Sequence, residues 1–429
     1  MMVTATKYRD ARADGVSEWY SRVYTEKEGF ELAERKRLQS ESDFSNGLFE
    51  RISPDNGRTW SDWTEVSGGA AVIYGVHERM APESDMSEVH PIWNPVHGHS
   101  VGIAMDRVFK NGHEAAYAAF WGRKGEGGFS DHTYLVIQKT NGSKTFQLVK
   151  YEEGAEFDPE DPVTPEYFER NTGYRGMNVV VEENGDIILL VCPSVKKCCE
   201  LEGIDTASVF PSCPDLMHGI LMLRGSWNGE KYEFTTSKPI IISDRLSSRG
   251  VDEATVAKLD SGRILIIFRG SNVRSESWNT RIEPGAPGFK WYCFSDDDGK
   301  TFSSPAPWRF NDGEAVYSSA SISYLFRGEK NGKLYWMGNI TDHKVYGNLP
   351  RWPLCLVEVD ETFGTAKKET LTVIDTVHKG ESEQVQLSNF SFWQNRETEK
   401  LEILVSKIGQ FAGESVWKSE VWHYEVGLE

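Results

Sequence analysis

The sequence predicts an all-β fold, a six-bladed β-propeller of four-stranded antiparallel blades that forms a single domain over residues 1–429 and is closed by its N-terminal strand. Three observations support it. A β-hairpin pattern occurs six times, helical patterns are sparse, and aromatic residues make up 12% of the chain, including 14 Trp. Repeats at a period of several tens of residues indicate a repeat architecture, and wide aromatic side chains suit packing between sheets.

Each repeat is an apolar alternating run, a polar turn and a second, more apolar run. The runs start at Ser21, Val101, Met177, Ala254, Ser321 and Phe390. Their turns contain Gly29, Gly112, Gly185, Gly262, Gly332 and the pair Glu399–Lys400, at intervals of 67 to 83 residues. Period-two alternation around a glycine turn is typical of a β-hairpin, and some 70 residues accommodate four strands with loops. Six hairpins therefore predict six blades.

The two ends of the chain are expected to share one blade. The last strand-like segment, Glu420 to Val426, has no following strand, and the stretch from Val3 to Tyr8 has strand character. Pairing them would cover a sheet edge that would otherwise be exposed.

Two turn motifs reinforce the assignment. Ser53 to Trp60 reads S-x-D-x-G-x-T-W, and Ser295 to Phe302 reads S-x-D-x-G-x-T-F. The Asp can hold the backbone N–H groups of the turn and Gly permits a positive φ. These motifs are Asp boxes, and the role expected of them is structural.

Composition indicates which partners to expect. The net charge is −18, which argues against nucleic acid or an anionic membrane surface as partner. No run of 18 apolar residues is present, and the start from Met1 to Gly15 lacks an apolar signal core. The expected location is the cytoplasm, or the periplasm or exterior if a signal peptide has been removed.

Four of the six cysteines lie close together, at Cys192, Cys198, Cys199 and Cys213. Their spacing is not a standard zinc pattern. Free thiols are favoured, with a local disulfide or a metal site as alternatives. The loop that carries them is expected to lie at the sheet end that carries Arg269 and to shape access to the site.

Two further segments carry a family resemblance. The first runs from Ala33-Glu-Arg35-Lys-Arg37 through Asp43 to the strand before the first Asp box. The second runs from Glu253 to Arg269, sixteen residues later. Because the turn near Gly262 lies roughly midway, strand pairing is expected to bring Glu253 and Arg269 together at one sheet end. With the Asp boxes, these segments resemble the sialidase (neuraminidase) superfamily over nearly the whole chain.

The resemblance implies roles for three residues. Asp43 would be the acid/base Asp, Glu253 the residue that polarises a nucleophile, and Arg269 an Arg that binds a substrate carboxylate. The chain departs from the pattern where a sialidase has its nucleophilic Tyr, because the stretch from Gln384 to Ser388 contains none. It also lacks an Arg near Ser318. A divergent member with weak or absent sialidase activity is therefore expected.

Polar residues at strand ends supply the remaining site candidates, because burying them requires compensation. Asp252 joins Asp43 and Glu253 as a catalytic candidate, although alternation along a strand would turn only one of Asp252 and Glu253 toward the site. The substrate-binding candidates are Arg35, Arg37, His97, Tyr174, Arg175, Arg249, Arg269 and Tyr317. Structural pairing is the alternative for each of them.

Two subsets suggest specific chemistry. Arg175, Arg249 and Arg269 could form a guanidinium cluster for an oxyanion. His97 and His99 form a His-x-His pair, but no third ligand is evident, so no metal and no cofactor are expected.

Three functions remain open. The leading one is an exo-acting glycoside hydrolase on a glycan that carries an acidic sugar, with Asp43 as acid and Glu253 or Asp252 as base. The second is a polysaccharide lyase acting on a uronate through His97, Tyr174 and Arg175. The third is a non-catalytic carbohydrate-binding propeller. All three take an oligosaccharide or polysaccharide as partner.

Overall fold

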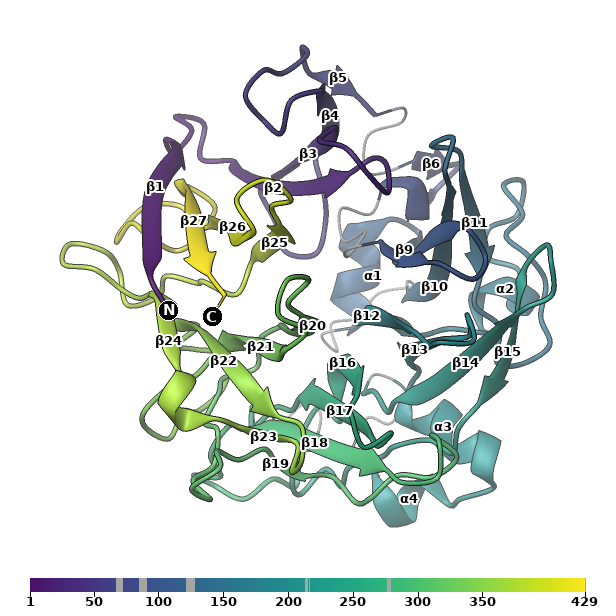
Figure 1. Cartoon of the computed structure of the whole chain (residues 1–429). Coiled ribbons are helices and arrows are strands. Elements are labelled where there is room, and N and C mark those ends of the chain that lie inside the picture. Colours follow the sequence, from purple (N-terminus) through teal and green to yellow (C-terminus); the bar gives the residue numbers. More distant parts are fainter. Residues whose placement is uncertain are drawn as a thin grey trace. The chain divides into compact units, whose positions relative to one another are not determined.

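The computed structural model describes residues 1–66, 72–84, 91–120, 128–212, 215, 217–275 and 279–428. They form six antiparallel sheets, labelled in Figure 1, and the fold class is the predicted six-bladed β-propeller. The chain divides into two compact units, Met1–Ala70 with Trp308–Glu429, and Ala71–Pro307. Each unit contains three of the sheets.

The first unit contains the first, fifth and sixth sheets. The first sheet has the order β2 (Ser17–Tyr24), β3 (Leu32–Gln39), β4 (Gly47–Ser53), β5 (Thr64–Glu65). The fifth has the order β20 (Ser323–Arg327), β21 (Leu334–Asn339), β22 (Leu354–Asp360), β23 (Thr365–Ala366), and β24 (Thr372–Asp375) also pairs with β22. The 3-10 helix η2 (Lys368–Thr370) connects β23 to β24. The sixth has the order β1 (Val3–Arg9), β27 (Val421–Gly427), β26 (Lys400–Ser406), β25 (Phe390–Gln394).

The second unit contains the other three sheets. The second sheet has the order β11 (Lys144–Leu148), β10 (Gly128–Lys139), β9 (His99–Lys110), β7 (His77–Met80), β6 (Val72–Tyr74), with β8 (Ile92–Asn94) also on β9. The third consists of β12 (Tyr174–Val181), β13 (Ile187–Cys192), β14 (Leu221–Trp227) and β15 (Tyr232–Thr236). The fourth consists of β16 (Asp252–Lys258), β17 (Ile264–Arg269), β18 (Lys290–Ser295) and β19 (Ala306–Pro307). The helices are η1 (Pro82–Ser84), α1 (His113–Phe120), α2 (Pro165–Phe168), α3 (Val195–Glu202) and α4 (Thr206–Val209).

Five of the six predicted hairpins form, and the second one is wrong. After β9 the chain enters α1 instead of a second strand, and β9 pairs with β10 and β7. The segment that was expected to be a strand contains Ala115, Ala116 and Ala118. Alanine has the highest helix propensity, and this local preference outweighs the hairpin pattern.

The N-terminal strand completes the sixth sheet, as the sequence predicts. β1 pairs antiparallel with β27, so that Val3 lies opposite Val426 and Thr6 opposite His423. Tyr8, near the end of β1, donates a 2.7 Å hydrogen bond to the buried Glu34 of β3. The first nine residues therefore tie the sixth sheet to the first.

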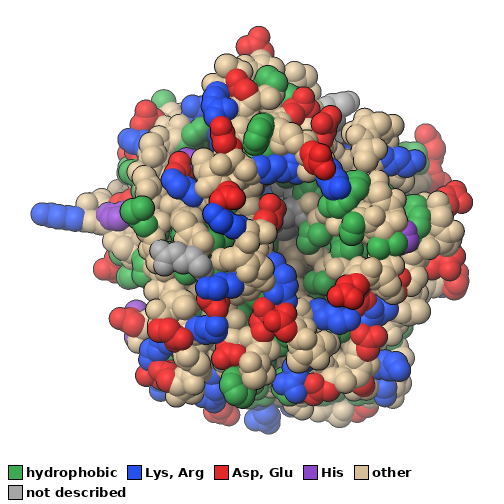
Figure 2. Space-filling model, in the orientation of Figure 1, with side chains coloured by type: hydrophobic (Ala, Val, Ile, Leu, Met, Phe, Trp, Pro, Cys, Tyr) green, Lys and Arg blue, Asp and Glu red, His purple; other side chains and the backbone are tan. Residues whose placement is uncertain are grey.

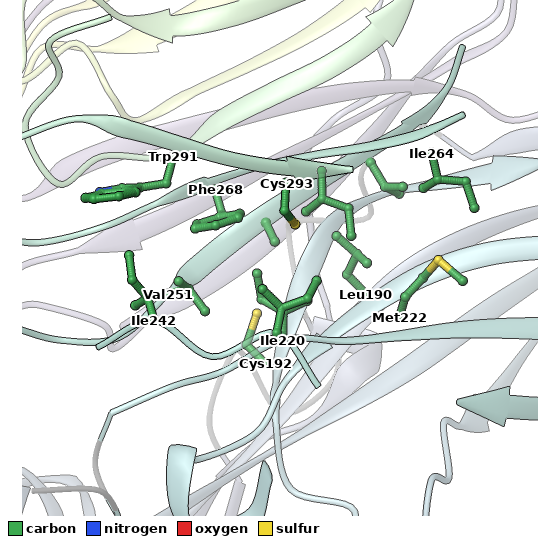
Figure 3. Packing of buried hydrophobic residues seen from close by; sticks show 14 of the residues in the cluster. Leu190, Cys192, Ile220, Met222, Ile242, Val251, Ile264, Phe268, Trp291 and Cys293 are labelled. Carbon is green, nitrogen blue, oxygen red and sulfur yellow. The ribbon is translucent and has the colours of Figure 1, made fainter. Parts of the chain in front are cut away.

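Buried aliphatic side chains hold the third and fourth sheets together. Leu190 and Cys192 of β13, Met222 of β14, Ile264 and Phe268 of β17 belong to one cluster, drawn in Figure 3. All five side chains are at most 3% exposed. At about 25 cal/mol per Å² of apolar surface removed from water, this packing is a main source of the stability of the second unit.

The two S-x-D-x-G-x-T segments form turns with the same hydrogen bonds. Asp55 Oδ1 accepts from the Thr59 backbone N–H at 2.7 Å, and Asp297 Oδ1 accepts from the Thr301 N–H at 2.9 Å. In both turns the serine hydroxyl also accepts from the glycine N–H, at 2.7 Å in the first and 2.8 Å in the second. The second turn lies at the strand end opposite to Arg269 in the fourth sheet, since Ser295 pairs with Ile264 and Lys290 with Arg269.

Figure 2 shows acidic and basic side chains interspersed on the face in view, so the negative charge is not segregated there. Over the residues that the structure describes, no helix is long and apolar enough to span a membrane.

Candidate functional site

An irregularity at the start of β16 brings two adjacent carboxylates to one guanidinium. Asp252 lies directly opposite Arg269 in the β16–β17 ladder, and the register shifts between Asp252 and Thr255. Glu253 within this bulge has a φ of 48°. A positive φ is costly for a non-glycine residue, and such strain is concentrated at functional sites.

Arg269 is held by both carboxylates. Its Nη1 donates to Glu253 Oε1 at 2.7 Å, and its Nη2 donates to Asp252 Oδ2 at 2.9 Å. The hairpin brings the strand ends that carry Glu253 and Arg269 together, as expected, and the bulge turns Glu253 toward Arg269. The expectation that alternation would turn only one of Asp252 and Glu253 toward the site is wrong, because the bulge interrupts the alternation.

Asp252 is stabilised in its ionised form. Burial alone would raise its pKa, but the neighbouring His218 and Arg269 outweigh burial and hold the pKa well below the ordinary value. The Glu253 backbone N–H also donates to Asp252 Oδ1 at 2.9 Å. Asp252 is therefore an ionised carboxylate that can stabilise a neighbouring positive charge. It has no proton to donate as an acid.

His218 is a member of this cluster that sequence reasoning missed. Its Nδ1 lies 3.5 Å from Asp252 Oδ2. It stands in an irregular segment, where isolated bridges join its backbone to Ser194 and Gly250. No local pattern marks His218, because its approach to Asp252 depends on how this segment crosses the sheets.

Tyr174 and Asp252 start two strands that run side by side. Asn178 of β12 donates to the Val256 carbonyl at 2.8 Å and accepts from the Val256 N–H at 2.9 Å. Tyr174 and Asp252 each precede this contact by four residues, so they lie at the same sheet end. We call this end, with Tyr174, Cys192, Asp252 and Arg269, the Arg269 end.

Two of the predicted arginines also lie at the Arg269 end. Arg175 follows Tyr174 and is buried, and it donates to the Gly176 carbonyl at 3.1 Å. Arg249 is half-buried and follows Ser248. The Ser248 N–H donates to the carbonyl of Ser271, which lies just beyond β17. Arg269 itself is committed to two carboxylates, so the three arginines do not present three equivalent guanidinium groups.

The charged residues of this cluster affect the pKa of Tyr174. Burial raises its pKa above the ordinary value; Arg175 opposes this shift, whereas Glu253 and Asp252 reinforce it. Arg107 acts on Tyr174 as well, from β9. The phenol is therefore protonated at neutral pH and can donate a hydrogen bond.

A second buried ion pair lies in the neighbouring sheet and was also missed. Arg107 donates to both oxygens of Asp131, at 2.6 and 2.7 Å. The Asp131 carbonyl accepts from Gly173 N–H at 2.7 Å, directly before Tyr174. A sequence signal was available, because both charged residues lie within strand segments rich in apolar residues, and buried charges require partners.

The predicted association of His97 with Tyr174 and Arg175 is not formed. His97 lies in the turn between β8 and β9, 6.0 Å from the Trp227 ring and stacked on His99 at 5.9 Å. A Cβ added to Gly185, in the β12–β13 turn, would stand 2.6 Å from the His97 ring. Tyr174 lies at the opposite end of β12 from that turn, and the length of the strand separates it from His97.

The remaining predicted residues belong to the first unit. Arg35 donates to Glu50 at 2.8 Å, and the Arg37 guanidinium lies 4.7 Å from the Trp19 ring centre. Asp43 is exposed in the β3–β4 connection, with a φ of 57° and a 3.1 Å bond from the Ser42 hydroxyl. Tyr317 is half-buried and bridges to Thr341. These contacts agree with structural roles, and binding or catalytic roles stay predictions.

The stretch from Gln384 to Ser388, which lacks the Tyr of a sialidase, forms a different contact. Gln386 accepts from Arg351 Nη1 at 2.9 Å, and Arg351 Nη2 donates to the Ala320 carbonyl at 2.9 Å. Arg351 follows β21 in the chain and Gln386 precedes β25, and both belong to the first unit.

The cysteine loop follows β13 at the Arg269 end, where it was expected. Cys198 and Cys199 lie on α3 and are buried free thiols, as is Cys192. Burial raises the pKa of Cys198. Cys213 lies outside the described residues, and within them no group of His, Cys, Asp or Glu is arranged to hold a metal ion.

No protein-family model and no curated protein matches the chain. Solved structures do resemble it. A protein of unknown function from Dyadobacter fermentans has a TM-score of 0.54 at 14% identity, covering 99% of each chain. The NanB sialidase from Streptococcus pneumoniae has a TM-score of 0.52 at 11% identity, covering 100% of this chain and 70% of its own. An α-L-arabinofuranosidase from Fusarium graminearum has a TM-score of 0.48 at 13% identity, covering 99% of this chain and 97% of its own. At these identities the likeness establishes the fold: the chain is a six-bladed β-propeller, similar in fold to a sialidase.

Proposed function

We propose that the protein is a glycoside hydrolase that removes a terminal sugar from a glycan carrying an acidic sugar. The observation that carries this proposal is the Asp252–Glu253–Arg269 cluster. Two nearly buried carboxylates, held in one geometry by a shared guanidinium, stand at the strand ends of a rigid sheet. Functional groups are commonly placed at such positions.

Glycoside hydrolysis passes through a transition state with positive charge on the sugar ring. Ionised carboxylates at the Arg269 end would stabilise that charge, and the low pKa of Asp252 keeps it ionised. Glu253 is the carboxylate proposed to act on the substrate. Asp43 stays a candidate for the acid by resemblance alone.

An acidic sugar is the finer part of the proposal. Arg175 and Arg249 would bind its carboxylate, because a guanidinium matches a carboxylate with two parallel hydrogen bonds. Arg269 already holds two carboxylates, so its part is to position Glu253.

The name of the fold neighbour also supports a carbohydrate substrate. NanB is a sialidase, and this chain matches 70% of its length at 11% identity. The absence of a Tyr from Gln384 to Ser388 speaks against the sialidase mechanism itself, so attack by water is proposed in place of a covalent intermediate.

The test is a panel of aryl glycosides with neutral and acidic sugars, including glucuronides and a sialoside. We expect aryl release from an acidic member other than the sialoside, and its loss in Glu253→Gln. Release from no member would contradict hydrolysis, and rapid release from the sialoside would contradict the argument from the missing Tyr.

A uronate lyase is the second candidate, favoured by His218 at the same sheet end as Tyr174 and Arg175. In this version of the lyase hypothesis His218 takes the place given to His97. Elimination leaves an unsaturated sugar that absorbs in the ultraviolet, which hydrolysis cannot produce. Incubating uronate polysaccharides with the protein and recording absorbance separates the two reactions.

A further inference from the structure

We propose that His218 is the general base of this site and that Asp252 is the residue that positions it. The inference rests on the proposed hydrolase function and goes beyond it, because it moves proton transfer from a carboxylate to an imidazole. In this assignment Glu253 stabilises charge and Asp252 does not touch the substrate.

The backbone fixes His218 at the Arg269 end. The His218 carbonyl accepts from the Val251 N–H at 2.9 Å, and a parallel bridge joins His218 to Gly250. Gly250 has a φ of 67°, and a Cβ at this position would stand 2.1 Å from the His218 carbonyl oxygen. Only glycine permits this approach, which places the imidazole beside Asp252.

The contacts of Asp252 determine what it can do. Oδ1 accepts from the Glu253 N–H, and Oδ2 faces both Arg269 and His218 Nδ1. An ionised carboxylate accepts hydrogen bonds only. His218 therefore carries its proton on Nδ1, and Nε2 has a lone pair that can accept a proton.

Nε2 is available to a substrate. The His218 side chain is 27% exposed, whereas Asp252 is 15% and Glu253 10% exposed. No described residue forms a hydrogen bond with Nε2. The imidazole is thus the most accessible titratable group of the cluster.

The other titratable groups of this site come from five elements. They are Tyr174 of β12, Cys192 of β13, Cys198 of α3, and Asp252, Glu253 and Arg269 of the β16–β17 pair. Burial raises the pKa of both thiols and of the phenol, so these three groups are neutral near pH 7. The charge of an imidazolium formed at His218 is balanced by Asp252.

The proposed step is a single displacement. Nε2 takes a proton from water while the water oxygen bonds to the anomeric carbon. The bond from that carbon to the leaving oxygen breaks, and the leaving oxygen takes up a proton from solvent. The imidazolium then returns its proton to solvent, so the histidine is restored.

The test compares H218Q and D252N with a matched control, H423Q. His423 is 20% exposed and lies 3.0 Å from Glu402, so it reproduces a half-buried His–carboxylate pair in another sheet. On the aryl glycoside that the wild type cleaves best, we expect H218Q to lower kcat/KM by ~100-fold or more, typical of removing an acid or base. Its remaining activity should lose the rise with pH that a neutral imidazole base requires. H423Q should retain wild-type activity.

A second measurement does not depend on turnover. Nitrogen-15 NMR of the imidazoles should show His218 with its proton on Nδ1 in the wild type. In D252N the proton should move to Nε2, the tautomer that free imidazoles favour, and kcat should fall with little change in KM.

The outcomes are distinguishable. Wild-type activity in H218Q, or a wild-type His218 protonated on Nε2, would overturn this inference and leave the hydrolase proposal standing. A wild type that cleaves no glycoside of the panel would overturn the hydrolase proposal and the base with it.

Discussion

At the scale of single residues, the chemistry of the candidate site rests on Glu253. Its positive φ and its bond to Arg269 place a carboxylate where regular strand geometry would not. Strain of this kind costs about 1–3 kcal/mol and persists where the surrounding structure imposes it. Arg269 and the bulge impose it here.

Glu253→Gln tests whether that carboxylate takes part in the reaction or only stabilises the fold. Gln preserves the shape and Asp252 still holds Arg269, so we expect a melting temperature close to that of the wild type. Turnover should fall by about 100-fold, since the charge that acts in the transition state is lost. Melting temperature and turnover are measured on the same preparation.

Glu34→Gln is the matched control. Glu34 is a buried carboxylate that binds Arg22 at 2.7 Å and Arg51, with no proposed chemical role. The Glu34→Gln substitution should lower the stability of the fold and leave kcat near the wild-type value. If Glu253→Gln behaves like this control, the Glu253–Arg269 pair is structural.

At the scale of elements, glycines and Asp turns fix where side chains meet. Gly250 permits the close approach of the His218 segment to β16, and Gly262 forms the β16–β17 turn. Both have positive φ, but their surroundings differ.

Gly250→Ala should be more damaging than Gly262→Ala. Both substitutions place a Cβ on a left-handed residue, at a cost of about 1 kcal/mol or more. At Gly250 the Cβ also meets the His218 carbonyl oxygen, whereas at Gly262 no atom lies within 4 Å. Urea unfolding of the two variants measures the difference. Equal losses would show that the His218 segment shifts freely.

The Asp297 turn should stabilise the fold only at a pH where the Asp297 carboxylate is ionised. Hydrogen bonds from Thr301 lower the pKa of Asp297 from 3.8 to about 2. A lowered folded-state pKa contributes stability above the unfolded value and loses it as pH falls toward the folded value. We therefore expect D297N to melt below the wild type at pH 7 and the gap to shrink between pH 4 and pH 2. A constant gap would mean that the charge of Asp297 is irrelevant.

At the scale of the whole molecule, the chain ends matter as much as the site. β1 covers β27, and without it β27 would expose a row of unpaired backbone groups. The register of β1 with β27 covers Val3 to Arg9.

Removal of residues 1–9 should destabilise the protein and cause association. The deletion exposes the β27 edge and removes the Tyr8–Glu34 hydrogen bond. Tyr8→Phe removes that hydrogen bond alone and is the control. We expect a small loss of melting temperature in Tyr8→Phe and a large loss with oligomers in the deletion, as measured by thermal melting and size-exclusion chromatography. A monomeric, stable deletion variant would contradict a closing role for β1.

We expect one cooperative unfolding transition, because the sequence predicts a single domain and each sheet needs a neighbour to bury its faces. Calorimetric and van't Hoff enthalpies should then agree. Two separate transitions would show that Met1–Ala70 with Trp308–Glu429 and Ala71–Pro307 are independent domains.

The sequence by itself determined the fold class, five of the six hairpins, the strand shared by the two ends and the approach of the strand ends that carry Glu253 and Arg269. These follow from period-two alternation and turn residues, which act over neighbouring positions in the chain. Only the tertiary structure decided the rest. The bulge that turns Glu253 toward Arg269, beside the paired Asp252, depends on a positive φ at Glu253. The approach of His218 depends on a bridge to Gly250, and the distance of His97 from Tyr174 depends on which sheet end each turn occupies. Such contacts join segments far apart in the sequence, and no local pattern specifies them, because strand register and the crossing of loops are fixed only when the sheets pack together.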